Sequence, residues 1–301
     1  MLHAAFARAF SFAVLLAAAL LDGDIGVRAH AVGTVAFVGS TPCDLGPRQF
    51  LGIPSEAACE RISWELLLTS SAGGGTGKYG LQAVYGMQAR NDPGFVNGGT
   101  AVRAQGTWTI RKGRAGASDA DVYRLAADTA GRTLDFVRLG ENLVHPLNDR
   151  GALMVGNAGW SYTLSRRPPN AERSMADATL ESVAGTQTAV FEGRTPCQEI
   201  VRLLNAPRGG ECTKMKWRVT LTPNSYKLES SMQRNPPRTG TWRIRRGAPD
   251  FGTTVYDLDP QPNGAFLSFL KVDDNHLFFL DRQGGLLVGD AYYSYTLSRT
   301  K

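Results

Sequence analysis

The stretch Ser161-Tyr162-Thr163-Leu164-Ser165-Arg166 returns residue for residue as Ser294 to Arg299. Working outward from this pair, other anchors of the first copy return in the same order in the second. They are Gly39 to Cys43 with Gly193 to Cys197, Cys59 with Cys212, Trp64 with Trp217, and Gly106 to Ile110 with Gly240 to Ile244. Matches that keep one order over most of the chain indicate a tandem duplication.

Each copy alternates short β-branched and aromatic runs with turn residues, the pattern of antiparallel strands. In the second copy the expected strands are 217–222, 226–230, 241–245, 254–258, 266–272, 276–280 and 292–298. Such a series of strands favours an up-and-down barrel, because closing the sheet removes its exposed edges. The predicted fold class is all-β, with two tandem small antiparallel barrels. Any helix is expected to be short and to lie between Cys43 and Cys59 or between Cys197 and Cys212.

The N-terminal residues are typical of an export signal. The apolar run from Ala9 to Leu21 is too short to span a membrane, and Ala29-His30-Ala31 has the small-x-small form of a cleavage site. We therefore expect a signal peptide over 1–31, the first barrel over 32–166, a linker over 167–185 and the second barrel over 186–301. No cysteine lies near the cleavage point to carry a lipid, and no later segment is apolar enough to span a membrane. A periplasmic or secreted protein is expected.

The cysteines are paired once per copy, as Cys43 with Cys59 and Cys197 with Cys212. An even number of cysteines in an exported chain favours a disulfide within each repeat. The alternative is a pair of thiols that responds to redox state or to a metal.

Composition and motifs give little support to an enzyme. Of the 4 His in the chain, only His145 and His276 follow the expected signal peptide, and they do not align between the copies. His145, beside Pro146, is expected in a loop or at a barrel rim. No His-Glu-x-x-His, Gly-x-Ser-x-Gly or Cys-x-x-Cys motif occurs, so we expect no catalytic site.

The net charge of +6 comes from an excess of arginine, part of which is clustered in the second copy. The cluster comprises Arg234, Arg238, Arg243, Arg245 and Arg246. It is either the solvent-facing half of an alternating strand or a contact for lipopolysaccharide, a lipid headgroup or an acidic protein. A nucleic-acid partner is not expected in an exported protein.

Large aromatic residues occupy matched positions in the two copies. They are Trp64 with Trp217, Trp108 with Trp242, and Tyr162 with Tyr295. We expect them to fill the cores or close the ends of the barrels. An eight-stranded barrel has just enough room for its side chains or for one small ligand. A hollow interior would favour a carrier of a small hydrophobic molecule.

The order of the motifs resembles the N-terminal domain of the copper resistance lipoprotein NlpE and its relatives. It runs from Gly-x-Thr-Pro-Cys through a cysteine before a Trp-containing strand and a Gly-Thr-Trp motif to a final Tyr-x-Leu-x-Arg strand, in both copies. The resemblance implies small lipocalin-like barrels and a role in copper homeostasis or envelope stress through protein contacts. Two features depart from the family: its Cys-x-x-Cys is replaced by widely spaced pairs, and its lipid-anchoring cysteine is missing.

Copper binding would need soft thiolate, thioether or imidazole ligands. The methionines are scattered and the two histidines are unmatched. If Cu(I) binds, the expected ligands are Cys43, Cys59, Cys197 and Cys212 in reduced form, and no other cofactor is expected. The function predicted from sequence is a non-enzymatic envelope protein similar to NlpE. The alternatives are a lipocalin-like carrier and a metal buffer.

Overall fold

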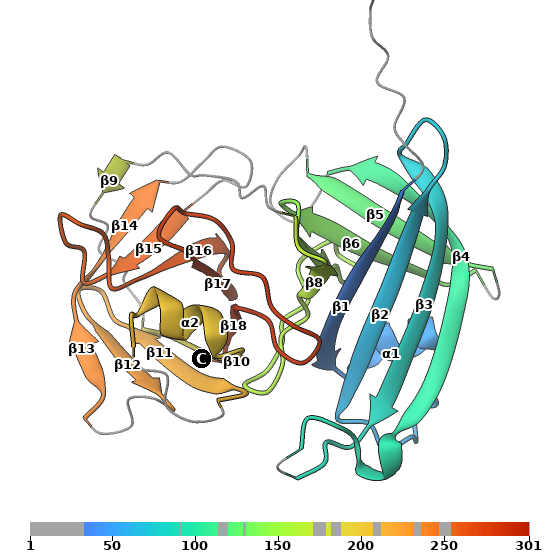
Figure 1. Cartoon of the computed structure of the whole chain (residues 1–301), viewed down its shortest axis with the longest axis horizontal. Coiled ribbons are helices and arrows are strands. Elements are labelled where there is room, and N and C mark those ends of the chain that lie inside the picture. Colours follow the sequence, from blue (N-terminus) through green and yellow to red (C-terminus); the bar gives the residue numbers. More distant parts are fainter. Residues whose placement is uncertain are drawn as a thin grey trace, which may run out of the picture.

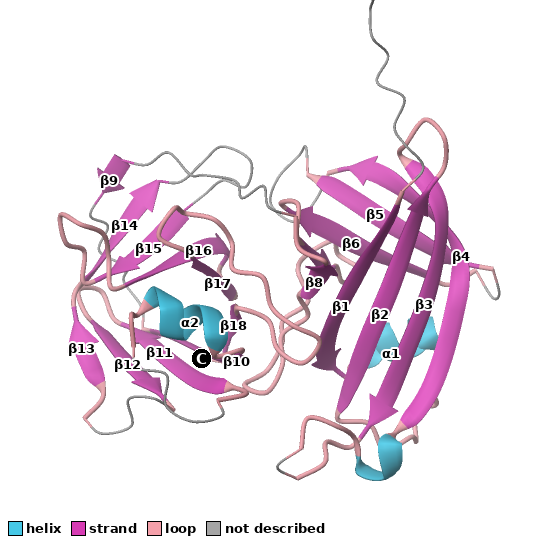
Figure 2. Ribbon diagram, in the orientation of Figure 1, coloured by secondary structure: helices cyan, strands magenta, loops and turns pink. Residues whose placement is uncertain are grey.

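A computed structural model of the chain describes residues 33–90, 92–113, 120–128, 131–170, 179–181, 188–206, 212–231, 236–246 and 254–300. The expected signal peptide and the side chains of Arg234 and Arg246 lie outside the described residues. Strands dominate the described part of the chain, and its helices are short (Figure 2). The predicted all-β fold is confirmed.

The first repeat is a closed barrel of consecutive antiparallel strands. Its strands are β1 (Thr34–Pro42), β2 (Arg61–Ser70), β3 (Thr76–Gly86), β4 (Thr100–Lys112), β5 (Asp121–Ala127), β6 (Thr133–Leu139), β7 (Leu143–Pro146) and β8 (Leu164–Arg167). The barrel closes because β1 pairs with both β2 and β8. The short helix α1 (Leu45–Leu51) lies between β1 and β2, and the 3-10 turn η1 (Val96–Gly98) lies between β3 and β4.

The second repeat has the same plan but a less complete closure. Its elements are β10 (Ala189–Thr195), α2 (Gln198–Leu203), β11 (Met215–Leu221), β12 (Tyr226–Ser230), β13 (Arg238–Gly240), β14 (Trp242–Arg246), β15 (Thr254–Leu258), β16 (Leu267–Asp273), β17 (His276–Leu280) and β18 (Thr296–Arg299). The strands follow one another in the sheet from β13 round to β14, with the short β9 (Thr179–Glu181) added outside β14. No pairing joins β13 to β14, which lie on either side of Thr241, so the described part of the sheet is nearly a barrel.

Several strand bounds differ from the sequence prediction by one or two residues, the strand β13 was not predicted, and two further differences are larger. The short strand β9 (Thr179–Glu181) comes from the expected linker and pairs with β14 at the edge of the second sheet. The expected strand over 292–298 begins only at Thr296, because the preceding residues form a tight turn in which Asp290 accepts hydrogen bonds from Tyr292 N and Tyr293 N.

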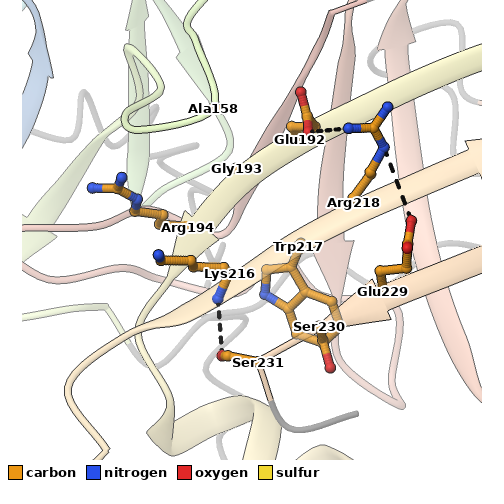
Figure 3. Close-up of a pocket in the computed structure, with 10 residues that line it drawn as sticks. All are labelled: Ala158, Glu192, Gly193, Arg194, Lys216, Trp217, Arg218, Glu229, Ser230 and Ser231. Carbon is orange, nitrogen blue, oxygen red and sulfur yellow. Dashed lines mark hydrogen bonds and ion pairs between the residues drawn. The ribbon is translucent and has the colours of Figure 1, made fainter. Parts of the chain in front are cut away.

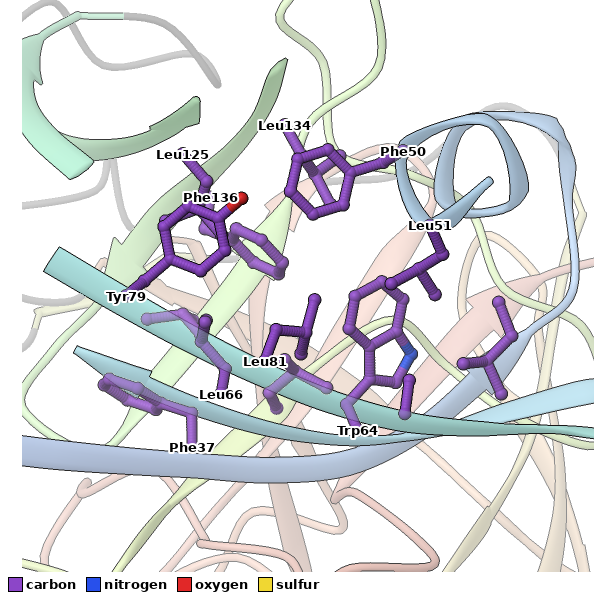
Figure 4. Packing of buried hydrophobic residues seen from close by; sticks show 14 of the residues in the cluster. Phe37, Phe50, Leu51, Trp64, Leu66, Tyr79, Leu81, Leu125, Leu134 and Phe136 are labelled. Carbon is purple, nitrogen blue, oxygen red and sulfur yellow. The ribbon is translucent and has the colours of Figure 1, made fainter. Parts of the chain in front are cut away.

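The interior of the first barrel is filled by apolar side chains. Phe50 and Leu51 of α1 close one end over the aromatic rings of Trp64, Tyr79 and Phe136 (Figure 4). The second barrel is filled in the same way. Its core includes Phe191, Trp217, Phe269, Phe279 and Tyr295.

Each helix is tied to its barrel at two points. The predicted disulfides are confirmed: Cys43–Cys59 precedes β2, and Cys197–Cys212 precedes β11. Tyr162 donates a hydrogen bond to Asp44 at the start of α1, and Tyr295 accepts one from Glu199 N in α2 at 3.2 Å. The matched tyrosines therefore join the end of each barrel to its helix.

The matched tryptophans also have equivalent partners in the two repeats. Trp64 Nε1 donates to Thr41 Oγ1 at 2.8 Å, and Trp217 Nε1 donates to Thr195 Oγ1 at 2.9 Å. The indole nitrogens of Trp108 and Trp242 donate to the backbone oxygens of Thr69 and Thr222. Pairing the polar end of each indole, three of which are buried and one partly buried, avoids the cost of an unsatisfied donor.

The two barrels lie side by side and share a third apolar core (Figure 1). The outer faces of β5 to β7 meet those of β15 to β17. The core includes Val122, Val137, Leu139 and Leu143 from the first repeat with Val255, Leu270, Phe278 and Leu280 from the second. Burying both faces at once couples the folding of the two repeats.

Candidate functional site

The stretch that is repeated without change lies in the seam between the barrels. Matched residues contact one another: Ser161 Oγ lies 2.5 Å from Ser294 Oγ, and Thr163 Oγ1 lies 2.9 Å from Thr296 Oγ1. Contacts between equivalent residues are a property of twofold arrangements. The repeats therefore face each other across an approximate twofold axis.

Two matched glycines let the backbones approach at this seam. A Cβ atom on Gly156 would lie 2.4 Å from Trp160 O and 2.8 Å from Ser298 Oγ. On Gly289 it would lie 2.4 Å from Tyr293 O and 3.1 Å from Ser165 Oγ. Contacts this short leave no room for a side chain, which accounts for glycine at both positions.

After each glycine, a short loop crosses to the other barrel. The Ala291 carbonyl accepts a hydrogen bond from Ser40 Oγ of the first repeat at 2.9 Å. In the opposite direction, the Trp160 ring lies 5.3 Å from the guanidinium carbon of Arg194 in the second repeat. Each barrel therefore supplies part of the other's outer surface.

The seam also contains a pair of fully buried histidines. His145 lies on β7, not in the loop or rim expected from sequence, and its ring centroid is 5.1 Å from that of His276 on β17. The carbonyl oxygen of Met154 lies 2.9 Å from His145 Nε2 and 3.1 Å from His276 Nε2. Because a carbonyl only accepts, both Nε2 atoms carry hydrogen.

The other ring nitrogens have different partners. His145 Nδ1 lies 3.0 Å from Thr163 Oγ1, so it accepts that hydroxyl when the ring is neutral. His276 Nδ1 lies 2.7 Å from Asp273 Oδ1, so it donates to the ionised carboxylate. The two histidines therefore differ in the partner of Nδ1, which is a hydroxyl for His145 and a carboxylate for His276.

The electrostatics agree with this assignment. Burial, and then the neighbouring His276, lower the pKa of His145 to about 3. Burial opposes ionisation of Asp273, but the hydrogen bond and charge of His276 outweigh it and lower the Asp273 pKa. The network has no solvent-accessible nucleophile, so we assign it a role in holding the seam.

Beside the seam, the outer face of β10 to β12 forms a groove of about 500 Å³ (Figure 3). Ala158 of the first repeat lies on one side. The charged residues that line it are Glu192, Arg194, Lys216, Arg218 and Glu229. They project outward because strand residues alternate, and the intervening Trp217 points into the barrel core.

The charges in the groove are balanced at one end only. Arg218 lies 3.0 Å from Glu192 and 3.9 Å from Glu229. Among the described residues, Arg194, Lys214 and Lys216 have no carboxylate partner within salt-bridge distance. Burial, together with the charges of Arg194 and Lys216, lowers the pKa of Lys214. This uncompensated cationic end makes the groove the candidate binding site.

Two of the three described members of the arginine cluster are paired within the protein. Arg238 contacts Asp259 at 2.7 Å, and Arg245 contacts Asp257 at 2.7 Å. Arg243 is exposed on β14. The described members of the cluster therefore offer less free charge than their spacing indicated. Sequence reasoning missed the groove because its cations come from separate strands.

The four cysteines are all oxidised in this structure, so none is a thiolate ligand. Among the described residues, no group of three or more His, Cys, Asp or Glu side chains could hold a metal ion. No helix in the described part of the chain is long and apolar enough to cross a membrane. Comparisons with protein families, curated proteins and solved structures find no match.

Proposed function

We propose that the protein is a non-enzymatic exported binding protein that acts through its outer surface as a rigid double barrel. The observation that carries this proposal is the filling of both barrels by their own side chains. A protein that carries a ligand inside needs an open chamber, and small-molecule sites usually have volumes of about 300–1,000 Å³. The hollow at one end of the first barrel, beside Phe37 and Trp108, has about 160 Å³. A larger hollow of about 800 Å³ lies beside α1, and its lining includes the charged residues Arg124, Arg132 and Asp135.

The two disulfides support the exported location, because such bonds persist in oxidising compartments. The shared core supports the rigid arrangement, since rotating one barrel against the other would expose apolar residues such as Val137 and Phe278. A fixed relative orientation keeps the groove and its Ala158 side in place.

Native mass spectrometry of the oxidised protein purified from the periplasm tests the proposal. We expect the mass of the processed chain without a hydrophobic ligand. A lipid or other apolar molecule bound in stoichiometric amount would overturn it and would favour the lipocalin-like carrier.

A role in copper homeostasis or envelope stress remains the proposal suggested by the resemblance to NlpE. In the copper version, reduced cysteine pairs supply the thiolates that Cu(I) prefers. Calorimetric titration with Cu(I) should then detect binding to the reduced protein and much weaker binding to the oxidised protein. No difference between the two forms would contradict the cysteine site.

A further inference from the structure

We propose that the cationic end of the groove, which Arg194 and Lys216 line with Lys214 nearby, binds a phosphate-class oxyanion. This inference rests on the proposed function of the outer surface as a binding surface and names the ligand chemistry. The first argument is charge. The two carboxylates of the groove are engaged with Arg218, which leaves the cations Arg194 and Lys216 beside an open space (Figure 3). Both also repel the nearby Lys214. A bound anion would relieve that repulsion.

The second argument is the placement of Arg194. Its guanidinium lies over the Trp160 ring at 5.3 Å, and its Nε atom is buried without a hydrogen-bond partner. Trp160 is itself held by a turn in which Asn157 Oδ1 accepts its backbone N–H at 2.9 Å. The first barrel therefore positions an arginine of the second, which reduces the cost of ordering that side chain when a ligand binds.

The third argument is that the matched face of the first barrel is built differently. Counting from the matched cysteines, Arg61 corresponds to Lys214, while Ser40 and Ser63 replace Arg194 and Lys216. Arg61 is buried and donates to Ser40 Oγ at 2.8 Å and to the backbone oxygens of Pro93 and Gly94. The guanidinium of Arg61 is therefore engaged with partners inside the protein, and the proposed oxyanion site has no counterpart in the first repeat.

A phosphate group suits these cations better than a carboxylate does. Its several oxygens can accept hydrogen bonds from a guanidinium and from ammonium groups at the same time. Its second negative charge also compensates more of the cationic excess. The same chemistry is available from a soluble phosphate compound and from the headgroup of an anionic phospholipid.

The experiment uses the oxidised full-length mature protein at low salt. One arm titrates inorganic phosphate by calorimetry, with acetate as the carboxylate comparison. The other measures co-sedimentation with phosphatidylglycerol vesicles against phosphatidylcholine vesicles. The variant Arg194→Gln/Lys216→Gln removes two groove cations. The matched control Arg103→Gln/Arg243→Gln removes the same charge from exposed positions on β4 and β14.

We expect the groove variant to bind at least tenfold more weakly in one arm, and the control to change less than twofold. Loss in the phosphate arm identifies a soluble source, and loss in the vesicle arm alone identifies a lipid headgroup. The proposal fails if neither probe binds, if both variants weaken binding equally, or if acetate binds as well as phosphate. These results are independent of the ligand-free mass that tests the proposed function, so the two can fail separately.

Discussion

The two repeats are alike inside and different outside. Trp64 and Trp217 occupy equivalent positions and donate hydrogen bonds to matched threonines. In each repeat a disulfide closes the loop that contains the helix, and the two loops have similar lengths. On the outer face of the first three strands, the first repeat has a buried arginine where the second has a partly exposed lysine. Packing constrains the core of both copies, whereas the outer face is free to diverge. Paired variants at matched positions test this division.

The largest effect is expected inside the barrels. Trp64→Ala and Trp217→Ala should each lower the free energy of unfolding by about 3–5 kcal/mol, because each leaves a large cavity in a filled core. Both should shift a single denaturant transition, since the shared core couples the repeats. The exposed Tyr292→Ala is the control and should change stability little. Unequal costs for the two tryptophans would contradict equivalent interiors.

The disulfides should behave as a second equivalent pair. Cys43→Ala/Cys59→Ala and Cys197→Ala/Cys212→Ala open loops with sequence separations of 16 and 15. The chain-entropy account gives about 3 kcal/mol for each. Denaturant unfolding of the two double variants should therefore give similar losses. If one pair were dispensable, its helix would not need the covalent link.

The outer faces should respond unequally. Arg61→Met removes a buried group with several hydrogen-bond partners and a ring contact to Phe95 at 4.0 Å, and should cost about 2 kcal/mol. Lys214→Met removes a cation repelled by Arg194 and Lys216, and should change stability little or raise it. Equal losses in urea unfolding would show that both residues are structural and would weaken the case for the groove.

The duplication, the barrel fold and the disulfide pairing could be predicted from the sequence, because matched residues have the same structural role in each copy. Cys43 and Cys197, for example, each form the disulfide within their own repeat. It did not reveal the seam. Thr163 and Thr296 alternate with apolar residues in the repeated stretch, and only the structure shows that they face each other. The residues on the outer face of a strand do not form a sequence pattern that tells whether this face contacts solvent or a second barrel. The one available clue was that outward serines and threonines were kept unchanged in the last strand of both copies.

The histidine pair was missed for a related reason. His145 aligns with Phe278, and His276 has no matching histidine, so alignment of the copies set them apart. Across an approximate twofold axis, contacts away from the axis join residues that do not match in sequence. A repeat comparison therefore identifies what the barrels share, while the sites between them depend on where the copies differ.

The smallest change in unfolding free energy at neutral pH is expected from a substitution at His145, which has no matching histidine in the second repeat. His145→Phe gives the first repeat the residue of the second. The folded protein holds the pKa of His145 near 3, below the ordinary unfolded value of about 6.5. Below the unfolded pKa, the unfolded chain binds a proton that the folded chain does not, so this group removes stability as pH falls from 6.5 toward 3. The loss is about 1.4 kcal/mol per pH unit.

Urea unfolding of the wild type and of the His145→Phe variant between pH 7 and pH 4.5 measures this loss of stability. The difference in unfolding free energy between wild type and His145→Phe should change with that slope below pH 6.5 and stay constant above it. The sign follows from a neutral His145 in the folded state, so a constant difference over the whole range would show that His145 titrates equally in both states. That result would remove the assignment of a neutral His145 in the folded protein.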